Sequence, residues 1–113
     1  MASVKAFLIC PVRNDPNAGR QYTEELESRG WTVHWPARDT NQDDHIGLRI
    51  CQDNRTAIRD ADVVFVVWDG ESQGSLFDLG IAFALDKEVR VLSLPSTEPG
   101  TKSFQAMIRE WAR

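Results

Sequence analysis

The stretch that decides the fold is ADVVFVVWDGESQGSLFDLGIAFALDK, residues 61–87. Residues 63–68 form an unbroken run of β-branched and aromatic side chains, which is typical of a strand in the middle of a parallel sheet. A turn rich in glycine and serine follows, and the apolar segment after it predicts a helix from about Ser75 to Lys87. The stretch therefore indicates strand, turn and helix, which is the repeating unit of α/β folds.

The same alternation extends in both directions along the chain. Upstream, strands are predicted over residues 4–12 and 31–35, and the helix between them ends at Gly30. A polar loop is expected over residues 37–44, followed by a helix whose inward stripe comprises Ile46, Ile50, Asn54, Ala57, Ile58 and Ala61. Downstream, we expect a strand over residues 89–94 and a helix from about residue 102 to the end.

Strands that alternate with helices over short loops pair in parallel through right-handed crossovers. We therefore predict one doubly wound α/β domain over residues 1–113, flavodoxin-like or Rossmann-like. It should have a mainly parallel sheet of roughly four to five strands and helices on both faces. Ligands of such sheets bind where the carboxyl ends of the strands meet a change in strand order. The loops over residues 11–17, 36–44 and 69–75 should line that edge.

Composition narrows the possible functions. A net charge of −4 and a pI near 5.1 argue against a nucleic-acid binder, although a local arginine can still hold a small anion. No apolar run is long enough for a membrane span, so we expect a soluble cytoplasmic protein. The spacing of Cys10 and Cys51 predicts buried free thiols, and His34 and His45 lack ligand spacing. We predict neither a metal site nor a cofactor.

Asp78 is the one acid on an otherwise apolar helix, and a buried carboxylate is costly unless it is paired or hydrogen-bonded. Two interpretations remain open. Ser75 and Asp78 match the spacing of a capping box, in which the acid reaches back to the start of the helix. Alternatively, the carboxylate is a nucleophile at the edge of the sheet.

Other residues of these loops are candidates for ligand binding. Ser72 and Gly74 lie in a strand-to-helix turn of the kind that presents N–H groups and hydroxyls to phosphate. Arg13 can supply a guanidinium to the same anion, although an arginine in a polar loop is usually only solvated. Trp35 either borders a base-binding cleft or packs in the core.

Four segments resemble motifs of the nucleoside 2-deoxyribosyltransferase family, and are most similar to those of the deoxynucleoside 5′-monophosphate N-glycosidases. They are residues 61–64 and 72–82, which belong to one strand-turn-helix running through residues 61–82, together with residues 9–13 and 104–109. The resemblance implies a cleft that binds a nucleoside or a nucleoside monophosphate. It also implies a carboxylate that attacks C1′ of the deoxyribose and forms a glycosyl-enzyme, as in a retaining glycosidase.

The resemblance assigns roles to particular residues. Asp78 stands in place of the nucleophilic glutamate and is one methylene shorter. Asn54 stands where the family usually has an aspartate that assists the leaving base, and an amide cannot be a general acid. Arg13 and Ser72 match phosphate-binding positions, with Pro11, Val12 and Gly74 beside them and Pro11 replacing a serine.

Gln105 matches a polar residue that reaches the site of a neighbouring subunit, which implies a homodimer. The altered catalytic positions leave a second hypothesis, a nucleotide sensor of the same fold without catalysis. A dimeric interaction protein without a ligand is the third.

Overall fold

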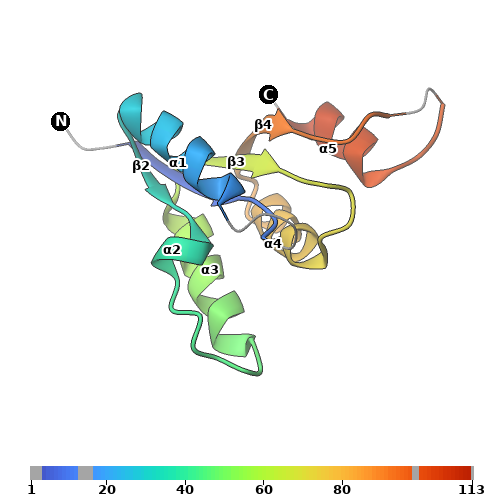
Figure 1. Cartoon of the computed structure of the whole chain (residues 1–113). Coiled ribbons are helices and arrows are strands. Elements are labelled where there is room, and N and C mark those ends of the chain that lie inside the picture. Colours follow the sequence, from blue (N-terminus) through green and yellow to red (C-terminus); the bar gives the residue numbers. More distant parts are fainter. Residues whose placement is uncertain (1–3, 13–16, 98–99, 113) are drawn as a thin grey trace.

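The structure is a computed structural model that describes residues 4–12, 17–97 and 100–112. Within these residues, four strands form one sheet: β1 (Val4–Ile9), β2 (Trp31–His34), β3 (Val63–Val67) and β4 (Glu88–Ser93). The helices are α1 (Ala18–Ser28), α2 (Pro36–Asp39), α3 (Leu48–Asp60), α4 (Gln73–Ala84) and α5 (Phe104–Trp111). Figure 1 shows them arranged around the sheet.

The sheet has the order β2-β1-β3-β4, and all neighbouring strands are parallel. In the register, Ala6 of β1 lies beside Val33 of β2 on one side and Val63 of β3 on the other. The chain first moves outward from β1 to β2 and then returns to the far side of β1 to form β3. The strand order therefore switches direction between β1 and β3, which is where such sheets bind ligands.

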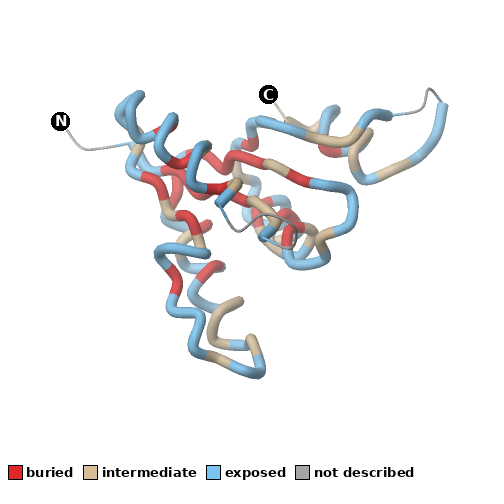
Figure 2. Tube along the Cα trace, in the orientation of Figure 1, coloured by how far each residue is buried: buried red, intermediate tan, exposed pale blue. Residues whose placement is uncertain are grey.

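Each face of the sheet packs against helices, so the predicted doubly wound α/β fold is confirmed. On one face, Leu26 of α1 packs on side chains that include Leu8 and Phe65. On the other, α3, α4 and α5 contribute Ile58, Leu79 and Ile108 to a second cluster. Figure 2 shows that the buried positions concentrate along the central strands. Strands buried on both faces explain the continuous apolar run of β3.

Two local predictions were wrong. The expected loop begins with a one-turn helix, α2, because Pro36 suits the first helical position and the Asp39 carboxylate accepts the Trp35 N–H at 2.9 Å. The inward stripe does not include Ile46, whose side chain is 82% exposed. Gly47, at φ 92°, separates Ile46 from α3, so the helical period does not extend back to it.

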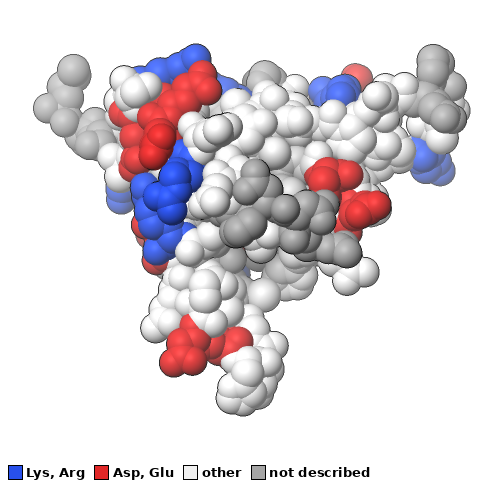
Figure 3. Space-filling model, viewed as in Figure 1, with Lys and Arg blue, Asp and Glu red and all other residues white. Residues whose placement is uncertain are grey.

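The surface carries charges of both signs. Figure 3 shows acidic and basic side chains side by side over α1, β2 and α2, where Arg38 pairs with Glu27 and Asp39. The face in view has no large basic area. None of the helices in the described parts of the chain is both long and apolar enough to cross a membrane.

Candidate functional site

A cavity of about 420 Å³ opens at the predicted edge of the sheet. Its size falls in the range of about 300–1,000 Å³ that is usual for small-molecule sites. The chain segments after β1 and β3 and the inner sides of α2, α3 and α4 form its walls. The lining residues are Leu8, Ile9, Cys10, Pro11, Val12, Pro36, Ala37, Gln42, Ile50, Cys51, Asn54, Ser72, Gly74, Ser75, Phe77 and Asp78.

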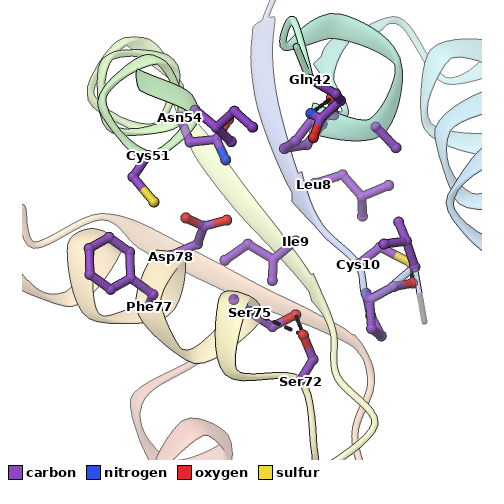
Figure 4. Close-up of a pocket in the computed structure, with 16 residues that line it drawn as sticks. Leu8, Ile9, Cys10, Gln42, Cys51, Asn54, Ser72, Ser75, Phe77 and Asp78 are labelled. Atoms are coloured by element: carbon purple, nitrogen blue, oxygen red, sulfur yellow. Dashed lines mark hydrogen bonds between the residues drawn. The ribbon is translucent and has the colours of Figure 1, made fainter. Parts of the chain in front are cut away.

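Asp78 enters the cavity from α4, and Asn54 approaches the same part of it from α3 (Figure 4). Gln42 and Cys10 stand on the opposite side. Most of the wall is apolar, so the carboxylate and the amide are conspicuous polar groups in it. This arrangement suits a ligand with an apolar ring and a few polar atoms.

The Asp78 carboxylate is largely buried but unpaired. Among the residues that the structure describes, none donates a hydrogen bond to it or forms an ion pair with it. Burial disfavours the charged form and raises the pKa of Asp78 from 3.8 to about 7. An acid with this pKa is present in both protonation states near neutral pH, which suits a reactive group better than a structural one.

The N-terminus of α4 is capped without Asp78. Ser72 is the capping residue, and its Oγ accepts the Ser75 N–H at 3.3 Å and the Ser75 hydroxyl at 3.0 Å. Because α4 begins at Gln73, Asp78 lies beyond the first turn and too far along the helix to reach back. The predicted capping box of Ser75 and Asp78 does not form, and the interpretation of Asp78 as a cap is wrong.

Asn54 is held from behind by a polar chain. It is only 6% exposed, as the inward stripe predicts. Its Oδ1 accepts a hydrogen bond from the Thr40 hydroxyl at 2.7 Å, and the Thr40 Oγ1 lies 2.8 Å from Nε2 of His34. The adjacent Asp53 instead points outward and pairs with Arg49 at 2.8 Å. Asn54 is therefore the residue of this pair that faces the cavity.

The cavity brings together six of the predicted site residues: Pro11, Val12, Asn54, Ser72, Gly74 and Asp78. Arg13 lies outside the described residues. Gln105 lies on α5, away from the cavity, and its Nε2 donates to the Ser96 carbonyl at 3.4 Å.

Trp35 does not line the cavity. It is 5% exposed and packs beneath α1, where it lies against Gly19. Side chains alternate between the two faces along an extended segment, so Trp35 shares the α1 face with Val33, while His34 faces the other way and stacks on Phe7. Of the two interpretations of Trp35, the structure supports packing in the core.

Sequence reasoning missed several residues of the wall. Cys10 and Cys51 form no disulfide among the described residues; both are half-buried and line the cavity, whereas the sequence predicts buried thiols. The helical period carries the signal for Cys51, which lies one turn before Asn54. Gln42 follows β2 and α2 at the carboxyl edge, so its place in the topology was the available signal. No sequence signal identified Phe77, because a phenylalanine in an apolar helix has the pattern of a core residue whether or not it is exposed.

The family model described as nucleoside 2-deoxyribosyltransferase matches residues 5–105. Similar solved structures include a 2-deoxyribosyltransferase from Bacillus psychrosaccharolyticus, with 20% identity and a TM-score of 0.70 over 96% of this chain and 82% of that one. A CMP N-glycosidase from Clostridium botulinum has 15% identity and a TM-score of 0.64 over the same shares. A deoxyribosyltransferase from Leishmania mexicana has 17% identity and a TM-score of 0.63 over 95% of this chain and 70% of that one.

No curated protein matches the sequence. The solved structures agree with the observed sheet and helices, and at these identities they establish the fold alone. The family model spans most of the sequence, including the segments after β1 and β3 that line the cavity. The chain therefore belongs to the nucleoside 2-deoxyribosyltransferase family.

Proposed function

We propose that the protein binds a 2′-deoxynucleoside or its 5′-monophosphate in the cavity and cleaves or transfers its N-glycosidic bond, with Asp78 as the nucleophile. One observation carries the proposal: the Asp78 carboxylate is unpaired among the described residues, largely buried, and part of the wall of a cavity of nucleoside size. Membership of the family supports the reaction class.

The proposed chemistry has two steps. The Asp78 carboxylate attacks C1′ of the deoxyribose as the bond from C1′ to the base breaks, and the bonding electrons leave with the base. Water or a second base then attacks C1′, and the carboxylate is released. Only the ionised acid can start this sequence, and an acid with a pKa of about 7 is ionised in about half of the molecules at neutral pH.

We assign Asn54 to positioning of the ligand. It faces the same part of the cavity as Asp78 (Figure 4), so it orients the sugar or the base relative to the carboxylate. An amide cannot transfer a proton to the leaving base. Departure of the base is therefore assisted by hydrogen bonding rather than by a general acid on this residue.

The 5′ end of the ligand is assigned to the start of α4. Ser72 and Gly74 line the cavity there, and a helix N-terminus favours a negative charge. Pro11 and Val12 line the cavity on the other side, and Arg13 follows them in the chain. We assign Arg13 and Ser72 to the 5′-phosphate or 5′-hydroxyl.

Release of free base from a panel of deoxynucleosides and their 5′-monophosphates tests this function. Asp78→Asn keeps the shape of the side chain and removes the nucleophile, so base release should fall by about a thousandfold or more. The matched control is Asp53→Asn, the same change on an exposed carboxylate outside the cavity, which should leave the rate unchanged. Equal rates for wild type and Asp78→Asn would show that Asp78 is not the nucleophile.

The sensor hypothesis predicts a different pattern. A sensor binds nucleotides in a calorimeter at concentrations where wild-type protein releases no base. Asn54 favours it as the second candidate, because an amide cannot act as the general acid of an acid pair. Binding without base release would contradict the catalytic proposal.

We further propose that two copies associate through the exposed side of α4 and α5. Phe77 and Phe83 of α4 are 57% and 59% exposed, which is unusual for large apolar side chains. A hollow of about 230 Å³ between the helices has no charged residue in its wall, which comprises Leu76, Leu79, Gly80, Phe83, Phe104, Met107, Ile108 and Trp111. Phe77 also lines the main cavity, so a second copy seated here would border the site.

Sedimentation of a Gly80→Glu variant tests the dimer. Gly80 is exposed on α4, and a Cβ there meets no atom within 4 Å, so the variant should fold and place a charge on the apolar surface. We expect a monomer for Gly80→Glu and a dimer for wild type. The control is Ile46→Glu, which adds a charge at an exposed apolar residue before α3. A wild-type monomer at high concentration would contradict the proposal.

A further inference from the structure

A chain of two hydrogen bonds connects the cavity to the other side of α3. It runs from Nε2 of His34 to Oγ1 of Thr40 at 2.8 Å and from Thr40 to Oδ1 of Asn54 at 2.7 Å. Thr40 is 5% exposed and Asn54 is 6% exposed, so water has little access to the bond between them, while the bond to His34 is partly buried. Asn54 alone of the three lines the cavity, while His34 borders a different surface cleft.

The single proton of the Thr40 hydroxyl couples the directions of the two bonds. The Thr40 hydroxyl has one hydrogen and donates it to Asn54, so toward His34 it can only accept. Nε2 of His34 therefore carries the hydrogen. Because Oδ1 of Asn54 is engaged with Thr40, its Nδ2 is the end left for a ligand. Among the described residues, none accepts a hydrogen bond from that nitrogen, although Asn54 lines the cavity.

The opposite direction is possible only for a neutral imidazole. In that arrangement, Nδ2 of Asn54 donates to Thr40, Thr40 donates to an unprotonated Nε2, and the cavity meets a carbonyl oxygen. A protonated imidazole has a hydrogen on both ring nitrogens and cannot accept. Protonation of His34 therefore permits only the first direction, in which Thr40 donates to Oδ1 of Asn54.

We propose that His34 and Thr40 are positioning residues that hold the Asn54 amide with its nitrogen toward the cavity, where it donates a hydrogen bond to an acceptor atom of the bound base. This inference rests on the proposed function for the identity of the ligand. The acceptor it selects is a carbonyl oxygen or an unprotonated ring nitrogen beside the glycosidic nitrogen. Negative charge develops on that atom as the bond breaks, so the donor also assists departure without giving up its proton.

The surroundings of His34 bear on its charge. Burial lowers its pKa, and Arg38 on α2 acts in the same direction, while Asp39 on α2 and Asp53 on α3 oppose them. On the β1 side the ring stacks on Phe7, with ring centroids 5.5 Å apart. The cleft it borders also contains Lys5 of β1 and Asp60 of α3. The net effect lowers the pKa of His34 from its ordinary value, chiefly through burial, which favours the neutral ring.

Nuclear magnetic resonance tests the relay without any ligand. The side-chain NH₂ signals of Asn54 and the ring signals of His34 are followed from about pH 5 to about pH 9. In wild type, the Asn54 signals should shift with the midpoint of His34. Thr40→Ser keeps the hydroxyl and should preserve this coupling, whereas Thr40→Val has the same shape without the hydroxyl and should abolish it. The control Thr101→Val, at an exposed position before α5, should behave as wild type.

Affinity tests the recognition of the base. The probes are 2′-deoxyuridine, which has a carbonyl beside its glycosidic nitrogen, and 1-phenyl-2-deoxyribose, whose ring has no acceptor. Thr40→Val should weaken the binding of 2′-deoxyuridine by about tenfold, which corresponds to the net contribution of one hydrogen bond. The affinity for the phenyl compound should not change. Thr40→Ser keeps the hydroxyl, so its affinities for the two probes should differ as they do in wild type. His34→Gln keeps a donor that does not titrate, so it should remove the dependence of the Asn54 signals on pH.

The outcomes separate this inference from the proposed function. If wild type binds neither probe, the proposed function is refuted, and the magnetic resonance experiment alone decides the relay. If wild type binds both probes and Thr40→Val weakens them equally, Thr40 is merely structural and the inference is overturned. The inference is also overturned if the Asn54 signals of wild type do not shift as His34 titrates. It is overturned as well if the Asn54 signals of Thr40→Val still shift with the titration of His34.

Discussion

Replacing Asp78 by asparagine should stabilise the protein, and only at neutral and alkaline pH. Burial raises the pKa of this acid from 3.8 to about 7, and each unit corresponds to about 1.4 kcal/mol of difference between its two protonation states. The ionised carboxylate therefore destabilises the folded state by on the order of 4 kcal/mol. Asparagine has the same shape and carries no charge, so it removes this cost.

The sign follows from proton linkage. Below about pH 4 the acid is protonated in both the folded and the unfolded chain, so Asp78→Asn should have little effect there. Between about pH 4 and pH 7 the folded chain binds more protons than the unfolded chain, and the wild type loses stability as the pH rises. Above about pH 7 the deficit is complete and constant.

Urea unfolding at a series of pH values measures this difference. The free energy of unfolding of Asp78→Asn minus that of wild type should grow from near zero to on the order of 4 kcal/mol across that window. Asp53→Asn is the control, because an exposed ion pair contributes about 0–1 kcal/mol and should show no such rise. Parallel curves for wild type and Asp78→Asn would mean that the carboxylate is hydrated or paired, and the argument for a reactive acid would fail.

Three further predictions concern the site and its supports. The kcat/KM of base release should rise by about tenfold per pH unit below about pH 7 and level off above it, because Asp78 must ionise; a rate independent of pH between about 5 and 8 would contradict this. Ser72→Ala removes the cap of α4 and should cost about 1 kcal/mol in urea unfolding. It should also weaken binding of 2′-deoxyuridine 5′-monophosphate by about tenfold and that of 2′-deoxyuridine by much less, and equal losses would remove Ser72 from the phosphate site. Gly19→Ala places a Cβ against the buried Trp35 ring, so it should cost about 1–3 kcal/mol in thermal or urea unfolding, and an unchanged stability would show that the two do not pack closely.

The sequence predicted the framework of this fold because its strongest signals are local. The apolar run of β3 and the Gly-Ser turn after it fix a strand, a loop and a helix without reference to the rest of the chain. The helical period placed Asn54 inward for the same reason, and its burial confirms that prediction. Family resemblance added the pairing of Asn54 with Asp78, which no local pattern contains.

The errors arose where tertiary contacts decide the outcome. The spacing of Ser75 and Asp78 matches a cap, but Ser72 begins the helix one turn earlier and takes that role. Trp35 was assigned to the cleft or to the core, and the alternation of an extended segment, whose register was not known, places it under α1.

The relay from His34 through Thr40 to Asn54 had no signal in the sequence. Its members are fourteen residues apart between Thr40 and Asn54 and belong to a strand, a loop and a helix. Each is unremarkable by itself, and only the packing of α3 against the sheet brings them into contact. Whether such hydrogen bonds form depends on differences of a few tenths of an ångström in the donor–acceptor distance, which residue patterns do not encode.

The central claim is that Asp78 forms a covalent bond with the sugar, and mass spectrometry of the reacting protein tests it most directly. Wild-type protein mixed with a 2′-deoxynucleoside 5′-monophosphate and quenched in acid should gain the mass of one 2-deoxyribosyl 5-phosphate. After trypsin digestion the added mass should lie on the peptide of residues 60–87, and fragmentation should place it on Asp78 rather than on Glu71 or the other acids of that peptide. Asp78→Asn should show no adduct. An adduct on another residue, or base release by wild type with no adduct at any time, would contradict the account.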